Sequence, residues 1–140
     1  MANQTVFTEP RVGCGAAIIV DGRILLMQRK TAPEAGCWGL PGGKIELFET
    51  APAAVRREVR EELGVDIEPL DLLCFVDQID AATGTHWVAP VYLVERIGGK
   101  PAILEPEKHG GLGWFALDDL PAELTCATVA AVEAWRRRRA

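Results

Sequence analysis

The segment 55–63, with the sequence VRREVREEL, places acidic side chains beside an apolar stripe. Its three apolar residues recur at every fourth position, so they line one side of a helix that turns by about 100° per residue. Glu58 and Glu62 border this stripe, whereas Glu61 lies farther round the helix. Glu58 and Glu62 are also i,i+4 neighbours, and like charges at this spacing destabilise a helix by roughly 0.2–0.5 kcal/mol. A chain with this helix therefore needs a fold in which a positive group offsets these carboxylates.

A glycine-rich loop, LPGGKIE at residues 40–46, precedes this helix. Glycine lets the backbone approach a ligand closely, and an exposed carbonyl oxygen can join the ligands of a metal ion. Carboxylate and carbonyl oxygens together suit Mg²⁺, Mn²⁺ or Ca²⁺. A solvated acidic face is the alternative, and it fits less well because two of the carboxylates border the apolar stripe. The pattern therefore predicts a site for a divalent cation.

This loop does not match two common motifs for phosphates or cations. A P-loop requires a glycine where Trp38 stands, and a serine or threonine where Ile45 follows Lys44. An EF-hand loop requires an alternating series of Asp and Asn before its glycine, and the sequence has none. The predicted cation site is therefore of another kind.

Apolar periodicity and turn residues divide the chain into strands and two helices, with no linker between them. Thr50 is a suitable N-cap, and Gly64 a suitable C-cap, for the helix that carries the carboxylates. The residues PGG at 41–43 are expected to interrupt any regular element. This order predicts one mixed α/β domain over residues 1–140. We expect strands at 12–20, 23–29, 38–40, 67–79, 87–97 and 113–116, and helices at 50–63 and 124–138.

Fifteen basic and twenty acidic side chains give this chain of 140 residues a net charge of −5. Broad binding of nucleic acid requires a basic face, so we expect no nucleic-acid partner. No apolar run approaches the ~20 residues of a membrane span, and no secretory signal precedes the first expected strand. The four cysteines are scattered, without the spacing of zinc ligands. We therefore expect a cytoplasmic protein without a membrane partner.

Gly43, Glu49 and the run REVREELGV at 57–65 resemble the Nudix box at every fixed position. The box covers 43–65, and a weaker likeness covers nearly the whole chain. The resemblance implies a Nudix α/β/α sandwich with a mixed β-sheet. It also implies hydrolysis of a nucleoside diphosphate linked to a further group, with Mg²⁺ as cofactor and Mn²⁺ as a substitute. Phe48 departs from the usual pattern, because many members have glycine just before the box glutamate.

The resemblance also implies which residues hold the metal and which accepts a proton. Glu61 or Glu58 would be the general base that takes a proton from the attacking water. A glutamate from a later loop would complete the metal ligands, and we favour Glu107 over Glu105 for this role. The implied metal ligands are a backbone carbonyl and four carboxylates: Gly42, Glu58, Glu61, Glu62 and Glu107.

Further residues are implied to orient these ligands or to contact the substrate. Arg57 pairs with Glu49 in the family and holds the loop against the helix. Arg29 stands where the family often has an arginine that contacts phosphate. Trp38 offers a ring that could stack on a base, and His86 flanks a region that could face the cleft. We take Arg29, Trp38 and His86 as the candidate substrate-binding residues.

Sequence marks outside the box favour a (deoxy)nucleoside triphosphate, cleaved to a nucleoside monophosphate and pyrophosphate. The segment EPEK at 105–108 resembles one in members that act on such triphosphates, and the marks of members acting on ADP-ribose or dinucleoside polyphosphates are absent. Hydrolysis of ADP-ribose or another nucleotide sugar is the alternative. A nucleotide-sensing module without turnover and a metal-stabilised structural protein are further alternatives. Homodimers are frequent in the family, so a second copy of the chain is a candidate partner.

Overall fold

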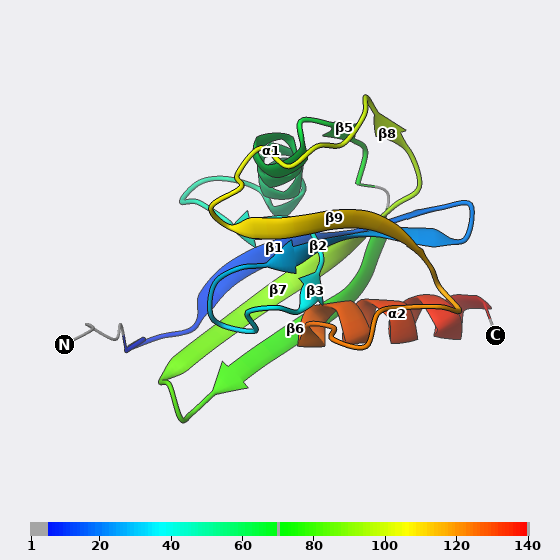
Figure 1. The fold of residues 1–140 in the computed structure, drawn as a ribbon. Helices are drawn as coiled ribbons and strands as arrows, with labels where there is room; N and C mark the ends of the chain where they lie inside the picture. The colour runs from blue at the N-terminus through cyan, green and yellow to red at the C-terminus, as the bar shows by residue number, and fades with distance from the viewer. Residues whose placement is uncertain (1–5, 70, 140) are drawn as a thin grey trace.

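The computed structural model describes residues 6–69 and 71–139. Figure 1 shows a central β-sheet with helix α1 on one face and helix α2 on the other, which confirms the predicted α/β fold. The elements, in chain order, are β1 (Arg11–Val20), β2 (Arg23–Arg29), β3 (Trp38–Gly39), β4 (Gly42–Lys44), α1 (Ala51–Leu63), β5 (Asp66–Ile67), β6 (Asp71–Asp80), β7 (Thr85–Val94), β8 (Ile97–Gly98), β9 (His109–Ala116) and α2 (Cys126–Arg139).

The main sheet is mixed, as predicted. Its strands follow the order β3-β2-β1-β7-β6, with β4 also paired to β1 and β9 also paired to β2. Strands β1 and β7 run parallel, and the other pairs in this sheet are antiparallel. Strands β5 and β8 form a separate two-stranded sheet beside α1.

Strand β1 changes its partner along its length. Near the hairpin turn it pairs with β2 through Ile19–Ile24 and Val20–Arg23. Toward its N-terminal end it pairs instead with β4, with Gly15 opposite Gly42. Strand β2 meanwhile pairs with β9 along its length. The part of the sheet that contains β2 and β9 therefore separates from the part that contains β1 and β4 with increasing distance from the hairpin turn.

The core lies in two layers, one on each face of β1. Alternate residues of a strand point to opposite faces, so Ala16 and Ile18 face α1, whereas Ala17 and Ile19 face α2. On the first face they pack with the apolar stripe of α1, which is fully buried. Each buried methylene stabilises the folded protein by about 0.8 kcal/mol. This stripe is therefore the main attachment of α1 to the sheet.

Helix α1 begins and ends at the predicted residues. The Thr50 side chain accepts a hydrogen bond from the backbone N–H of Ala53 at 3.3 Å, which is an N-cap. Gly64 has a φ of 72°, and its N–H donates to the carbonyl of Arg60, which closes the C-terminal end. Because both caps and the buried stripe fix this helix, the rotation of its carboxylates is fixed as well.

Several expected boundaries were wrong. The PGG sequence was expected to interrupt regular structure, but Gly42 begins β4, which pairs with β1. The runs 67–79 and 87–97 are each divided, because β5 and β8 leave the main sheet and pair with one another. Strand β9 extends beyond 113–116 toward its N-terminus, where it follows β2, and α2 begins at Cys126 rather than at 124.

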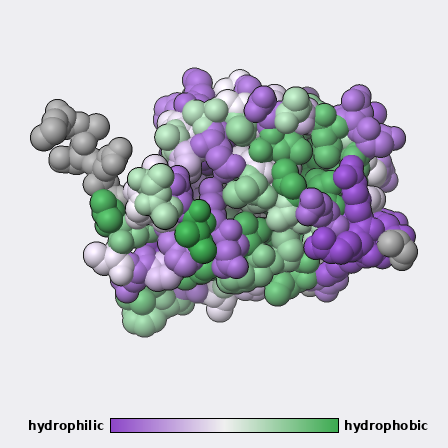
Figure 2. Space-filling view, turned by 90° about the horizontal axis from the view of Figure 1, so that it is seen from below, coloured by the Kyte–Doolittle hydropathy of each residue, from purple (hydrophilic) through white to green (hydrophobic). Residues whose placement is uncertain are grey.

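Figure 2 shows the face that carries α2, where hydrophilic side chains gather at the end of the helix. Its last turn holds the arginine run 136–139. Arg136 donates to the carbonyl of Leu117 at 2.8 Å, and Arg138 donates to the carbonyl of Leu72 at 2.8 Å. These arginines therefore fasten the helix end to its neighbours. Within residues 6–69 and 71–139, neither helix has the length and hydropathy that a membrane crossing requires.

Candidate active site

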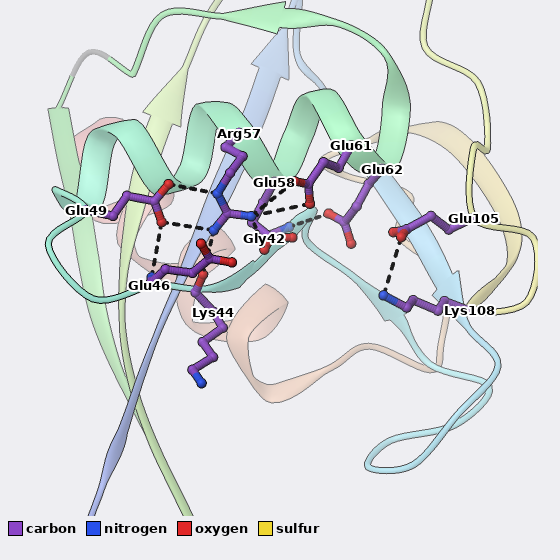
Figure 3. A network of polar contacts seen from close by, with 10 residues as sticks. All are labelled: Gly42, Lys44, Glu46, Glu49, Arg57, Glu58, Glu61, Glu62, Glu105 and Lys108. Atoms are coloured by element: carbon purple, nitrogen blue, oxygen red, sulfur yellow. Dashed lines mark hydrogen bonds and ion pairs between the residues drawn. The ribbon is translucent and has the colours of Figure 1, made fainter.

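Strand β4 holds the glycine loop directly against helix α1. The backbone N–H of Gly42 donates a 2.8 Å hydrogen bond to Oε1 of Glu62, whose side chain is buried. A Cβ at Gly43 would collide with the carboxylate of Glu58, and a Cβ at Gly42 would collide with the carbonyl oxygen of Cys14. Glycine at both positions therefore lets the backbone come close to its neighbours, and Figure 3 shows Gly42 beside the carboxylate of Glu62.

Arg57 connects the loop to the helix through several hydrogen bonds (Figure 3). Its guanidinium donates to both carboxylate oxygens of Glu49, at 2.7 and 2.9 Å, and to the carbonyl of Lys44 at 2.9 Å. It also donates to Glu58 at 2.8 Å and to Glu61 at 3.3 Å. This paired contact with a carboxylate is the strong geometry for arginine, so Arg57 orients the loop, Glu58 and Glu61 together.

The carboxylates differ in how far the protein favours their charged forms. The pKa of Glu62 is raised to about 8, chiefly by burial; the hydrogen bond from Gly42 opposes this increase, and the charges of Glu58 and Glu105 contribute to it. Burial also raises the pKa of Glu58 above its ordinary value, although Arg57 opposes this. In contrast, hydrogen bonds from Arg57 lower the pKa of Glu49 to about 2. The charge of Glu62 is therefore the one that the surrounding protein offsets least.

Two residues from a later part of the chain, Glu105 and His109, lie close to Glu62. Ligand atoms of Glu62, Glu105 and His109 all lie within 4.8 Å of one another. Nε2 of His109 lies 3.4 Å from Oε2 of Glu62, and both residues are buried. Burial lowers the pKa of His109. Its Nδ1 is buried without a hydrogen-bond partner among the described residues.

Glu105, and not the favoured Glu107, lies in this group. The backbone turns back on itself after Glu105, because the N–H groups of Lys108 and His109 both donate to its carbonyl. This turn leaves Glu107 exposed and directs Glu105 toward Glu62. This geometry favours Glu105 over Glu107 as the candidate ligand from the later loop.

The donor atoms fit a divalent cation. Within the described part of the chain, Glu62 has no ion pair with lysine or arginine, since Arg57 contacts Glu49, Glu58 and Glu61 instead. Buried carboxylates normally require a paired cation, and oxygen donors suit Mg²⁺ or Mn²⁺. The imidazole nitrogen in the group adds a donor that suits Mn²⁺ better than Mg²⁺.

A cavity of about 310 Å³ extends from these residues into the space where the sheet halves separate. Gly42, Gly43, Glu62 and His109 line it, together with glycines of β1 and with side chains of β6, β7 and the start of α2. The cavity thus connects Glu62, beside Glu105 and His109, with a recess of mixed polar and apolar character. Such a combination is common for small-molecule sites.

The three candidate substrate residues lie in different places. Arg29 lines the cavity, and its Nε donates to the carbonyl of Pro33 at 2.7 Å. Trp38 and His86 are not among the described residues that line this cavity. The Trp38 ring instead packs edge-on against Phe115, with 4.9 Å between ring centroids. Trp87, the residue after His86, does line the cavity, because successive strand residues face opposite sides of the sheet.

Three further residues that line the cavity are His109, Glu34 and Gln78, and none of them is among the site residues expected from the sequence. Glu34 follows a proline in a loop, and Gln78 lies on a strand far along the chain. For Gln78, the alternation of residues along β6 could have indicated its inward orientation, because it shares a face with the buried Val76.

The comparisons with known proteins agree with this architecture. A family model described as NUDIX domain matches residues 9–135. The chain is 34% identical over 116 residues to an ADP-ribose pyrophosphatase of Methanocaldococcus jannaschii, covering 83% of this chain and 68% of that protein. It is 37% identical over 105 residues to a putative 8-oxo-dGTP diphosphatase 2 of Mycobacterium tuberculosis, covering 74% and 72%. The crystal structure of a MutT NUDIX hydrolase from Burkholderia pseudomallei has a TM-score of 0.88 and 63% identity, covering 90% of this chain and 98% of that one.

Proposed function

The chain belongs to the Nudix family of hydrolases that act on pyrophosphate bonds, and we propose that its substrate is a (deoxy)nucleoside triphosphate. The products are a nucleoside monophosphate and pyrophosphate. The observation that carries this proposal is a cavity lined by the buried Glu62, whose ligand atom lies within 4.8 Å of those of Glu105 and His109, and continuing into a recess of mixed polar and apolar character. The group suits a phosphate chain bridged by a cation, and the recess suits a nucleoside.

Mg²⁺ is the proposed cofactor, and Mn²⁺ can substitute for it. The residues that would hold it are Glu58, Glu62 and Glu105, with the carbonyl of Gly42 and the more exposed Glu61 as further candidates. When bound, a divalent cation neutralises phosphate charge and makes the attacking water more acidic. His109 stands beside this set and supports the orientation of Glu62.

The chain's own residues supply positioning and a proton acceptor. Water attacks a phosphorus of the α–β bridge, the bridging P–O bond breaks, and a carboxylate takes the proton of the water. Glu58 suits this acceptor role, because burial raises its pKa and Arg57 orients it through a 2.8 Å hydrogen bond. Glu61 is the other candidate, and it is more exposed and more loosely held by Arg57. Arg29 lines the cavity, which supports a role for it in contacting phosphate.

ADP-ribose is the second candidate substrate. The archaeal relative named as an ADP-ribose pyrophosphatase favours it, whereas the mycobacterial relative is named for a nucleoside triphosphate. Both substrates contain a diphosphate that the same carboxylates could engage. They differ in the group beyond it, which is a second ribose in ADP-ribose and a terminal phosphate in a triphosphate.

A nucleotide panel with Mg²⁺ tests this proposal. The panel contains the four dNTPs, ADP-ribose and UDP-glucose, and release of pyrophosphate and of monophosphate is measured by chromatography. We expect kcat/KM for at least one dNTP to exceed that for ADP-ribose tenfold or more. Glu62→Gln should lower the rate by at least about a hundredfold, whereas Glu133→Gln, at an exposed position on α2, should not change it. Faster cleavage of ADP-ribose than of every dNTP would contradict the proposed substrate class.

A further inference from the structure

Glu34 lines the cavity and is fixed there by two contacts. Its Oε2 accepts a 2.7 Å hydrogen bond from the backbone N–H of Cys126, the first residue of α2. Its Oε1 accepts a 3.1 Å hydrogen bond from Nε2 of Gln78 on β6. Glu34, Gln78 and the start of α2 all line the cavity. Two elements far apart in the sequence therefore hold one carboxylate at the cavity wall.

The carboxylate of Glu34 retains capacity for further hydrogen bonds. An ionised carboxylate accepts at about four lone-pair positions, and the contacts with Cys126 and Gln78 use two of them. It can only accept hydrogen bonds, so a ligand at this wall must present N–H or O–H donors. Gln78 uses one N–H on Glu34, which leaves a second N–H to donate and a carbonyl oxygen to accept.

Other residues that line the cavity favour a flat ligand. Gly13 and Gly15 line the cavity without side chains, and Trp87 stands beside Gly13, where a Cβ would lie 3.5 Å from its ring. Met27 adds a polarisable apolar side chain to the lining. An aromatic ring, a thioether and a bare strand surface together suit the face of a nucleobase.

We propose that Glu34 is the residue that determines base specificity and that, with Gln78, it selects a guanine-type edge. This inference rests on the proposed nucleotide function. The guanine edge presents N1–H and the 2-amino group to Glu34, and O6 to the free N–H of Gln78. The adenine edge presents the acceptor N1 to a carboxylate, which is repulsive. Oxidation of guanine at C8 leaves this edge unchanged, so Glu34 does not by itself distinguish the oxidised base.

Steady-state kinetics with a series of three triphosphates measures this base selectivity in the intact enzyme. The wild-type kcat/KM should fall in the order dGTP, dITP, dATP, because inosine lacks the 2-amino donor and adenine lacks both donors. Glu34→Gln keeps the size of the side chain and removes its charge. Hydrogen bonds to charged groups are stronger than neutral ones, so the dGTP:dATP ratio should fall by about 10- to 100-fold in this variant. Glu133→Gln, on the exposed side of α2, should keep the wild-type ratio.

Binding of the product monophosphates separates this inference from the proposed function. Calorimetry should give at least tenfold tighter binding of dGMP than of dAMP to the wild type, and Glu34→Gln should abolish the difference. Equal binding of dGMP and dAMP by the wild type would overturn the role of Glu34, whether or not triphosphates are hydrolysed. A variant that loses activity equally on all three triphosphates would also overturn it. Absence of triphosphate turnover, with selective dGMP binding retained, would refute the proposed function alone.

Discussion

The buried carboxylate of Glu62 makes the stability of the metal-free protein depend on pH. Its pKa is about 8 in the folded protein, against 4.5 for the ordinary side chain. The folded state therefore binds this proton more tightly than the unfolded state does. The resulting stability is fully present below about pH 4.5 and is lost as the pH rises through 8. Each unit of difference in pKa corresponds to about 1.4 kcal/mol, so raising the pH from about 5 to about 9 should cost on the order of 4 kcal/mol.

Glu62→Gln is the perturbation that isolates this contribution. Glutamine keeps the shape of the side chain and cannot ionise, so the variant should lack this loss of stability. Urea denaturation in EDTA, at about pH 5, 7 and 9, gives the free energy of unfolding of both proteins. The difference between variant and wild type should change by on the order of 4 kcal/mol across this range.

A divalent cation supplies a second arm of the same experiment. Millimolar Mg²⁺ should raise the Tm of the wild type most at high pH, because the cation binds the ionised carboxylate of the folded state. The Tm of Glu62→Gln should rise much less. If wild type and Glu62→Gln lose stability in parallel between pH 5 and 9 in EDTA, Glu62 is not the source of the pH dependence. Glu133→Gln, which removes an exposed carboxylate, should follow the wild type throughout.

Three substitutions around the glycine loop have distinct expected outcomes. Gly43→Ala should lower kcat by about a hundredfold with little change in Tm, because the new methyl group displaces the flexible carboxylate of Glu58; an unchanged kcat would be inconsistent with the geometry. Arg57→Lys should lower kcat/KM by about 10- to 100-fold, because lysine cannot donate two parallel hydrogen bonds to Glu49; steady-state kinetics would show this. Phe48→Gly should raise the free energy of unfolding by about 1 kcal/mol in urea denaturation, since Phe48 has a φ of 68° and an exposed ring; a loss of stability would argue otherwise.

The helix and its carboxylates could be predicted from the sequence because the information is local. Periodicity placed Glu58 and Glu62 beside the buried stripe, and Thr50 and Gly64 marked the helix ends, as the structure has them. The order of strands and helices follows from similarly local patterns. These features depend on residues within a few turns of one another, where sequence spacing determines spatial distance.

The remaining parts of the site depend on contacts between distant segments. Glu105 and Glu107 are the same residue type and lie two positions apart. Only the hydrogen bonds that turn the backbone at Glu105 determine which side chain faces Glu62. The Trp38 ring packs against Phe115 because β3 and β9 both pair with β2, an arrangement that no local pattern contains. Tertiary structure likewise brings Glu34 to Gln78 across 44 positions of the chain.

The change of partner along β1 has a consequence for how this enzyme can diversify. Because the backbone itself parts there, the hollow requires no large side chains to be removed from a packed interior. Some residues on its walls, such as Glu34 and Gln78, lie outside the buried core, so they can be exchanged at small cost in stability. A new substrate can in this way be accommodated by altering a few of these wall residues, while the acidic residues of α1 stay unchanged.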